Sequence, residues 1–265
     1  MEGLVEAPPL VGLIPAGGQA TRIMPIPCSK ELLPVGFFQQ SLDGQLRPKT
    51  ACHYVLERMR WAGIENAYIV IRRDKWDIPS YFGNGSLLDM HLGYLVVERT
   101  PNVPYTLDQA YPFVRGARIA LGFGDILFDA RDAFVHVLNR QVATSADVVL
   151  GLFPADKPEK VDMVEVDKMG RVKSLTIKPR HTHLQYTWGV AVWNSTFSDF
   201  LHATAALSGS SSAGQKEIFI GDVIQSAINK GLHVDSVRVS DHPYIDIGTV
   251  EDLARAVRLF GRHEV

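Results

Sequence analysis

Alternation of strand-like and helix-like segments is the feature that most constrains the fold of this chain. Residues 11–15 form a short apolar run that ends at a glycine turn, as expected of a buried strand. Thr50 is a candidate N-cap for a helix over residues 51–61, which Gly63 ends. The segments expected next are strands at 67–71, 92–97, 119–122 and 148–153, with helices at 107–115 and 130–141. This alternation predicts an α/β fold, a three-layer α/β/α sandwich with a mostly parallel Rossmann-like central sheet.

The pattern changes after Pro154. Residues 163–166 and 172–177 flank a turn-like Lys-Met-Gly and predict a hairpin, and residues 188–193 add a strand. We therefore expect a β-rich insertion over residues 155–193 that could wall a substrate pocket. The remaining expected elements are a flexible loop at 208–214, a helix at 221–230, a strand at 233–239 and a helix at 250–260.

Composition excludes several classes of function. With 265 residues, 46% apolar and 21% charged, the chain can bury a full-sized core. Lys and Arg are scattered and the formal net charge is −2, so no basic stripe exists for a nucleic-acid backbone. The apolar runs are shorter than the ~20 residues of a membrane helix, and the first residues lack a positive n-region. We expect a cytoplasmic protein with Cys28 and Cys52 as free thiols, acting on a small anionic ligand.

The glycine turn after the first strand is a candidate phosphate site. Residues 17–22 read Gly-Gly-Gln-Ala-Thr-Arg, and the backbone N–H groups of such a turn can converge on phosphate oxygens. Arg22 and Lys30 add positive charge. The turn has neither the Gly-Lys-Ser/Thr of a P-loop nor the spacing of a dinucleotide fingerprint. The glycines alone leave open whether this is a phosphate site or an ordinary strand-to-helix connection.

The longer sequence around this turn carries a family resemblance. Residues 12–25 read GLIPAGGQATRIMP and residues 28–35 read CSKELLPV. Together they resemble the signature LAGGxGTRLxP…SKxLLPV of glucose-1-phosphate thymidylyltransferases. Further segments resemble that family in the same order: GNGS at 83–86 (family GDGS), LDQA at 107–110 (LAQA), GDILF at 124–128 (GDNIF), KP at 178–179 (EKP), WGV at 188–190 (TGLY) and YIDIGT at 244–249 (WLDTGT).

The chain thus resembles the sugar-1-phosphate nucleotidyltransferases over nearly its whole length. The resemblance implies a magnesium-dependent enzyme of sugar nucleotide biosynthesis, which transfers a nucleotidyl group from a nucleoside triphosphate to a sugar-1-phosphate or similar phosphorylated acceptor and releases pyrophosphate. It favours dTTP or UTP, with CTP as an alternative. It also implies a single domain over residues 1–265, in which approximately 8–154 form a nucleotide-binding half, and 155–265 form a sugar-binding half with closing helices.

The resemblance assigns roles residue by residue. Arg22, Lys30 and Lys178 would be catalytic, through their charge on the reacting phosphates. Asp125 and Asp246 would be the Mg²⁺ ligands, although an Asp beside a glycine is by itself more often a cap or turn residue. The residues that would contact the nucleotide are Ala16, Gly17, Gly18, Glu98, Gln109 and Gly124. The residues that would contact the sugar are Asp162 and Gly189.

Departures from the family pattern leave the substrates open. Ile177 stands where the family has a sugar-binding Glu, and residues 161–163 stand where a Tyr-Gly pair lines the sugar. A different acceptor, such as a non-glucose phosphate or a phosphonate, therefore remains an alternative. Glu98 stands approximately where the family has a Gln that contacts the base. An ionised Glu can only accept hydrogen bonds, so it would suit the N4 amine of cytosine, which donates them.

Two further departures concern assembly and activity. Residues 36–47 are longer than the family's connection, and the sequence given stops soon after the helix that follows Asp246, without the family's extra helical segment. We therefore expect a monomer or homodimer rather than the family's tetramer. The altered sugar contacts also support an alternative function, that of a catalytically inactive protein that binds a nucleotide or sugar nucleotide in a regulatory role.

Overall fold

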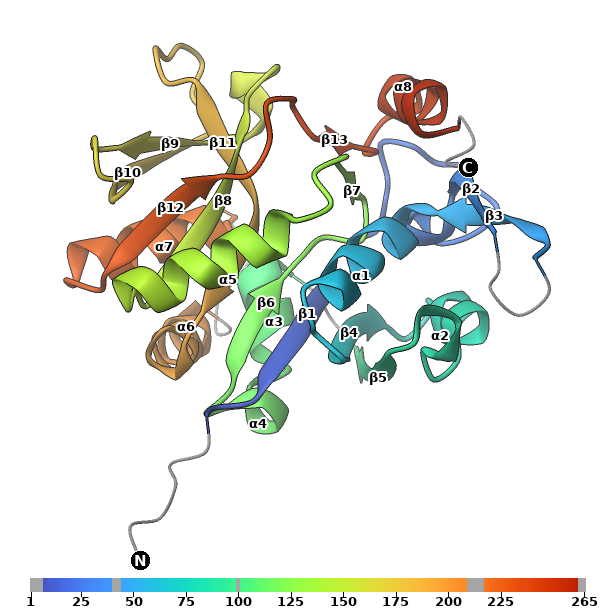
Figure 1. The fold of residues 1–265 in the computed structure, drawn as a ribbon, viewed down its shortest axis with the longest axis horizontal. Helices are drawn as coiled ribbons and strands as arrows, with labels where there is room; N and C mark the ends of the chain where they lie inside the picture. The colour runs from blue at the N-terminus through green and yellow to red at the C-terminus, as the bar shows by residue number, and fades with distance from the viewer. Residues whose placement is uncertain (1–6, 40–43, 99–100, 209–216, 262–265) are drawn as a thin grey trace, which may run out of the picture.

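A computed structural model describes residues 7–39, 44–98, 101–208 and 217–261 of the chain (Figure 1). Residues 209–214 of the expected flexible loop lie outside these ranges. In the described part, no helix is both long enough and apolar enough to cross a bilayer.

The described residues contain a nine-stranded sheet, as the alternating sequence pattern predicts. Its main path runs β10-β9-β11-β6-β1-β4-β5, and β8 and β12 extend it beside β11. The last four strands of this path are parallel: β6 (Arg118–Leu121), β1 (Leu10–Ala16), β4 (Asn66–Arg72) and β5 (His91–Val97). The other strands are β8 (Val148–Pro154), β9 (Asp162–Val166), β10 (Val172–Ile177), β11 (Tyr186–Trp193) and β12 (Val234–Arg238).

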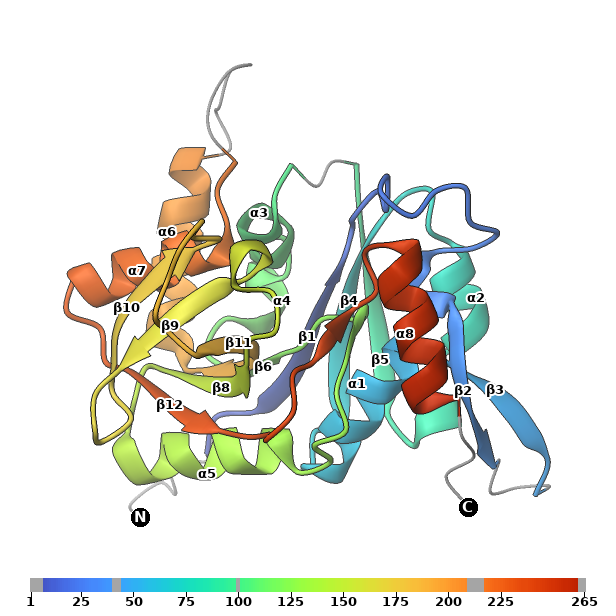
Figure 2. The ribbon, with the colours of Figure 1, turned by 90° about the horizontal axis from the view of Figure 1, so that it is seen from above.

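Helices cover both faces of the sheet and form the three layers. Successive side chains of a strand point to opposite faces, so Ile14 of β1 lies in one core cluster and Leu13 in the other. Figure 2 shows α1 (Ala51–Trp61) and α5 (Ala133–Thr144) together on the first face. The other face carries α3 (Val103–Asp108), α4 (Tyr111–Val114), α6 (Ser195–Ser208) and α7 (Ile220–Asn229).

Shorter elements lie outside the nine-stranded sheet and the helices that cover it. These are the 3-10 helices η1 (Lys30–Leu32), η2 (Ser86–Leu88) and η3 (Pro158–Lys160), the helix α2 (Asp77–Phe82), the antiparallel ribbon of β2 (Pro34–Gln39) and β3 (Leu46–Thr50), and the pair of β7 (Ile126–Leu127) with β13 (Ile245–Asp246). The last helix, α8 (Val250–Phe260), packs beside β2, where the Phe260 and Tyr54 rings lie 5.2 Å apart (Figure 2).

Strand order fixes where a ligand site can form. β1 pairs with β4 on one side and with β6 on the other, so the direction of winding reverses at β1. In parallel α/β sheets, ligands bind at the carboxyl ends of the strands beside such a reversal. The glycine turn follows β1 and Asp125 follows β6, so both lie at this edge.

Local chemistry explains where the elements differ from expectation. The helix expected over residues 107–115 is divided into α3 and α4, because Pro112 has no backbone N–H to donate to the carbonyl oxygen of Asp108 and so cannot continue α3. α3 also begins earlier, where the Asn102 side chain accepts a hydrogen bond from the Tyr105 N–H at 2.8 Å. α1 has the expected bounds, but the Thr50 side chain makes no capping hydrogen bond.

We predict that Phe153→Ala strongly destabilises the fold. Phe153 of β8 is fully buried, and its ring lies 5.1 Å from that of Phe128 and 5.4 Å from that of Tyr244. Its truncation leaves a cavity between the sheet and the segment that leads to β13, which costs about 3–5 kcal/mol of unfolding free energy. Urea unfolding measures this loss. Phe113→Ala is the matched control, because Phe113 is 61% exposed; equal losses in the two variants would contradict the prediction.

Candidate active site

The pairing of β7 with β13 brings two distant acidic residues together. Asp246 pairs with Ile126 in this two-stranded sheet, and the Ile247 N–H donates to the Asp125 carbonyl oxygen at 3.0 Å. The Asp125 side chain is largely buried; Asp246 keeps contact with solvent, although the surrounding protein desolvates its carboxyl group in part. Asp125 and Asp246, which are 121 positions apart in the sequence, therefore lie side by side at the carboxyl ends of the parallel strands.

Two cations face these carboxylates. The Lys30 ammonium donates a hydrogen bond to Asp125 Oδ2, and its aliphatic chain passes Gly18, where an added Cβ would lie 3.9 Å from Lys30 Cε. The Arg22 guanidinium lies against Gly248, where an added Cβ would lie 2.7 Å from Arg22 Nη2 and 3.2 Å from Asp246 Oδ1. The glycine turn, Arg22, Lys30 and the two carboxylates thus form one cluster.

The charges in this cluster shift the pKa values of the two carboxyl groups in opposite directions. Burial tends to raise the pKa of Asp125, but the charge and hydrogen bond of Lys30 outweigh it, so the Asp125 pKa lies below its usual value. Desolvation and the negative charge of Asp125 raise the pKa of Asp246, despite the opposing charges of Lys30 and Arg22. The pair therefore carries one firmly ionised carboxylate beside one that gains a proton more readily.

A cleft beside the cluster is rich in charged side chains. It has a volume of about 180 Å³ and is bordered by Arg22, Asp246 and Gly248 on the side of the cluster. Its other charged lining residues are Asp156, Lys157, Lys160, Lys178, Asp252 and Arg255. Two ion pairs cross the cleft, Lys157 with Asp252 at 2.5 Å and Arg255 with Asp156. With five cations and three carboxylates in its lining, the cleft suits an anionic ligand.

Lys178 and Asp162 lie on the far side of this cleft, at the end of the β9–β10 hairpin. The Lys178 ammonium lies 3.7 Å above the Phe219 ring, and Lys178 adopts a positive φ of 45°. The Asp162 carboxylate approaches Gly221 at the start of α7 so closely that a side chain there would collide with it. Gly189 of β11 packs against the Tyr244 ring, which would lie 3.0 Å from an added Cβ, so a side chain there would require the ring to shift.

The remaining sequence-assigned residues have unequal relations to the cluster. Ala16 and Gly17 are buried where β1 ends. Gly124 packs between Glu31 and Cys52, with both side chains 3.1 Å from an added Cβ. Glu98 is exposed after β5 and lies 3.5 Å from the Arg73 guanidinium, and Gln109 Nε2 donates to the Tyr105 carbonyl oxygen at 3.4 Å. No hydrogen bond or ion pair among the described residues joins Glu98 or Gln109 to the two aspartates.

Sequence reasoning did not identify three residues beside the assigned ones: Lys75, Asp77 and Phe219. Lys75 and Asp77 contact the residues on either side of Lys30, and Phe219 contacts Lys178. The position of Lys75 and Asp77 in the sequence could have identified them as site residues. Both follow β4 and therefore lie at the carboxyl end of a parallel strand, where ligands bind. Phe219 had no such signal, because it precedes a helix on the opposite face.

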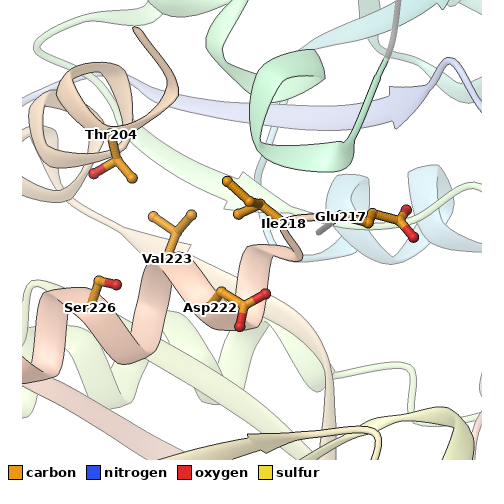
Figure 3. Close-up of a pocket in the computed structure, with 6 residues that line it drawn as sticks. All are labelled: Thr204, Glu217, Ile218, Asp222, Val223 and Ser226. Carbon is orange, nitrogen blue, oxygen red and sulfur yellow. The ribbon is translucent and has the colours of Figure 1, made fainter. Parts of the chain in front are cut away.

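A second cavity, between α6 and α7, differs in chemistry from the cleft. It has a volume of about 260 Å³ and is lined by Thr204, Glu217, Ile218, Asp222, Val223 and Ser226 (Figure 3). No Lys or Arg is among the described residues that line it. Asp222 is already engaged in capping α7, since it accepts the Phe219 N–H at 2.8 Å. This cavity is therefore poorly suited to phosphate groups.

Comparison with known proteins assigns the chain to a family. Residues 11–261 match the family described as "Nucleotidyl transferase". Glucose-1-phosphate thymidylyltransferase of Streptomyces griseus is 28% identical over 254 residues, which cover 93% of this chain and 65% of that protein. The enzyme of the same name from Streptomyces antibioticus is 24% identical over 249 residues, with coverages of 93% and 65%. The chain therefore spans about two thirds of the length of these relatives.

The fold is also found in solved structures. A Bacillus anthracis protein, provisionally assigned as a glucose-1-phosphate thymidylyltransferase and crystallised in complex with sucrose, superposes with a TM-score of 0.80. The alignment covers 97% of each chain at 20% sequence identity. This similarity establishes the shared architecture.

We predict that Asp162 makes stability depend on pH. Burial, with a smaller contribution from the charge of Asp222, raises the pKa of the half-buried Asp162 carboxyl from 3.8 to about 6, despite Lys178 and a hydrogen bond from Trp188. The folded protein then holds this proton more tightly than the unfolded chain. The stabilisation that results is complete below about pH 4 and is lost as pH rises through about 6.

The test is urea unfolding of wild type and Asp162→Asn at pH 4, 5, 6 and 7. Asn has no proton to lose, so the stability of wild type relative to the variant should fall by on the order of 1–2 kcal/mol from pH 4 to pH 7. Asp241→Asn is the control, because Asp241 is 81% exposed. If the curves of wild type and Asp162→Asn stay parallel, the pKa of Asp162 is not raised.

Proposed function

Since the chain belongs to the nucleotidyl transferase family, we propose that it transfers a nucleotidyl group from a nucleoside triphosphate to the phosphate of a sugar-1-phosphate or a similar phosphorylated acceptor. The observation that carries this proposal is the cluster of Asp125, Asp246, Lys30 and Arg22 beside the glycine turn. It combines anionic and cationic groups at one edge of the sheet, as a reaction between two phosphates requires.

The proposed reaction forms one P–O bond and breaks another. An oxygen of the acceptor phosphate attacks the α-phosphorus, and the bond from that phosphorus to the bridging oxygen of the β-phosphate breaks, so that pyrophosphate leaves with the electron pair. Lys30 and Arg22 would offset the negative charge that develops on the α-phosphate and on the leaving group. Gly17 and Gly18 would let the backbone approach the triphosphate, and Lys178 would hold the acceptor phosphate from across the cleft.

The chemistry of the two carboxylates fits Mg²⁺. Mg²⁺ is usually bound in phosphate-processing sites by one or two carboxylates together with substrate phosphates, and Asp125 and Asp246 form such a pair. When bound, the ion would polarise the phosphate oxygens and neutralise their charge. The Lys30 contact to Asp125 keeps this carboxylate ionised and therefore able to act as a ligand.

The same proposal divides the chain into two functional parts within one domain. The part from approximately residue 8 to residue 154 would bind the nucleotide, and Ala16, Gly124 and Gln109 would lie close to it. The favoured nucleotides are dTTP and UTP. Residues of approximately 155–265 would bind the acceptor, with Asp162 and Gly189 close to the sugar. The exposed Glu98 carboxylate also suits CTP, since it can accept from an amine.

We predict that Asp125→Asn and Lys30→Met each lower kcat/KM by at least about 100-fold, because each removes charge at the reacting phosphates. Pyrophosphate release with MgCl₂ measures the rate, and chelation of the metal should abolish it reversibly. Asp89→Asn is the matched control, because Asp89 is 85% exposed and pairs only with Arg60 among the described residues.

A non-catalytic binding protein would give a different result. In that case no nucleotide would yield pyrophosphate, while calorimetry would detect nucleotide binding that Asp125→Asn leaves unchanged. That outcome would refute the proposed turnover and support the regulatory alternative.

We also predict that a matrix of dTTP, UTP, CTP, ATP and GTP against phosphorylated acceptors shows a preference for pyrimidine nucleotides. The acceptor panel should include sugar-1-phosphates, phosphorylated alcohols and phosphonates, because Ile177 cannot hydrogen-bond a sugar through its side chain. Pyrophosphate release reports each pair. A strict requirement for ATP or GTP would contradict the assignment of the base.

A further inference from the structure

We propose that Lys75 and Asp77, in the connection that runs from the end of β4 into the first residue of α2, are positioning residues that hold Lys30 in place for the reaction. The inference rests on the proposed function of Lys30 and adds two residues that act through its neighbours. Ser29, Lys30 and Glu31 are consecutive, and the residue on each side of Lys30 is bound by a side chain from this one connection.

Asp77 binds the residue before Lys30. Its carboxylate accepts the backbone N–H of Ser29 at 2.6 Å and the Ser29 hydroxyl at 2.8 Å, one hydrogen bond on each oxygen. Two hydrogen bonds from one planar group fix both the position and the orientation of Ser29. Ser29 in turn accepts the Leu32 N–H at 2.8 Å, so it also sets the start of η1.

Lys75 binds the residue after Lys30. Its ammonium donates to both carboxylate oxygens of Glu31, at 2.8 and 2.9 Å. This ion pair is deeply buried, with Glu31 only 2% and Lys75 only 6% exposed. A buried pair of this kind contributes little to stability compared with apolar residues of similar volume, so its presence beneath Lys30 is better explained by placement and charge control.

The charge of Glu31 explains why Lys75 is required. Three carboxylates, those of Asp125, Asp246 and Glu31, act on the charge of Lys30. Lys75 engages both oxygens of Glu31, which leaves the Lys30 ammonium to face Asp125. Without Lys75, a desolvated carboxylate next to Lys30 would compete with Asp125 and the substrate for its ammonium.

The connection that carries both side chains is itself held by hydrogen bonds and by packing against the core. The Lys75 N–H donates to the Arg72 carbonyl oxygen at 2.9 Å, and the Ile78 N–H donates to Asp77 Oδ1 at 3.1 Å. Ile78 is fully buried in the core beneath α2. Lys30 is therefore tied to the central sheet through β4 and α2 as well as through its own segment.

The experiment compares Asp77→Ala, Lys75→Met and the double variant Glu31→Gln/Lys75→Met in the full chain. We expect Asp77→Ala and Lys75→Met to lower kcat about 100-fold, as expected for a displaced catalytic group. KM for the nucleotide should change by less than about threefold, because the interaction acts on the transition state. The double variant should recover at least about tenfold of the kcat lost in Lys75→Met, since it removes the unpaired carboxylate.

Hydrogen–deuterium exchange of the segment 27–33 gives a readout that does not depend on turnover. Asp77→Ala should speed its amide exchange by at least about tenfold, because the Ser29 N–H loses its acceptor and the segment opens locally. Asp74→Ala is the matched control: Asp74 belongs to the same connection, is 64% exposed and pairs with Arg72 at the surface. Lys173→Met controls for the loss of an exposed lysine.

The outcomes separate this inference from the proposed function. If wild type releases pyrophosphate but Asp77→Ala keeps both wild-type kcat and wild-type exchange, the positioning role is overturned. It is also overturned if the double variant loses as much kcat as Lys75→Met. Should wild type release no pyrophosphate, the proposed function fails, and the exchange of segment 27–33 alone decides whether Asp77 holds it. Should Lys75→Met not fold, Asp77→Ala decides, because Asp77 is only half-buried.

Discussion

Like-charge repulsion between Asp125 and Asp246 is the constraint around which the site is organised. The β7–β13 pair forces the two carboxylates together, and the largely buried position of Asp125 strengthens every charge that acts on it. Lys30 binds Asp125 directly, and Arg22 lies against the segment of Asp246. The opposite pKa shifts of the two carboxyl groups are the consequence. A pair held in this way is a natural ligand for a divalent cation, which is the role we propose for it.

The sheet makes this arrangement possible because three of its parallel strands end at the same edge. The glycine turn follows β1, the Lys75–Asp77 connection follows β4, and Asp125 follows β6. The fourth contribution, Asp246, comes from the C-terminal part of the chain. It reaches the edge because β13 pairs with β7 and α8 packs beside β2. The site therefore depends on packing at two distant places, the central sheet and the α8 surface.

Across the cleft, a second group of residues provides a different environment. Lys178 lies over the Phe219 ring, and Asp162 is desolvated by the start of α7, which raises its pKa to about 6. Both side chains belong to the β-rich part that the hairpin and β11 build. The two ion pairs between α8 and residues 156 and 157 connect this part to the last helix, which packs beside β2.

The sequence by itself determined the parallel α/β architecture, the family and the chemical types of the assigned residues. Apolar periodicity and glycine turns are local signals, so β1, α1 and the β9–β10 hairpin could be predicted from them. Pro112 is also a local signal, but the pattern of residues 107–115 favoured one continuous helix, so the division into α3 and α4 was not predicted. Only the tertiary structure decided which charges meet. Lys75 with Glu31, Asp77 with Ser29 and Phe219 with Lys178 each join separate segments, and such contacts depend on strand order and helix packing, which no local pattern specifies.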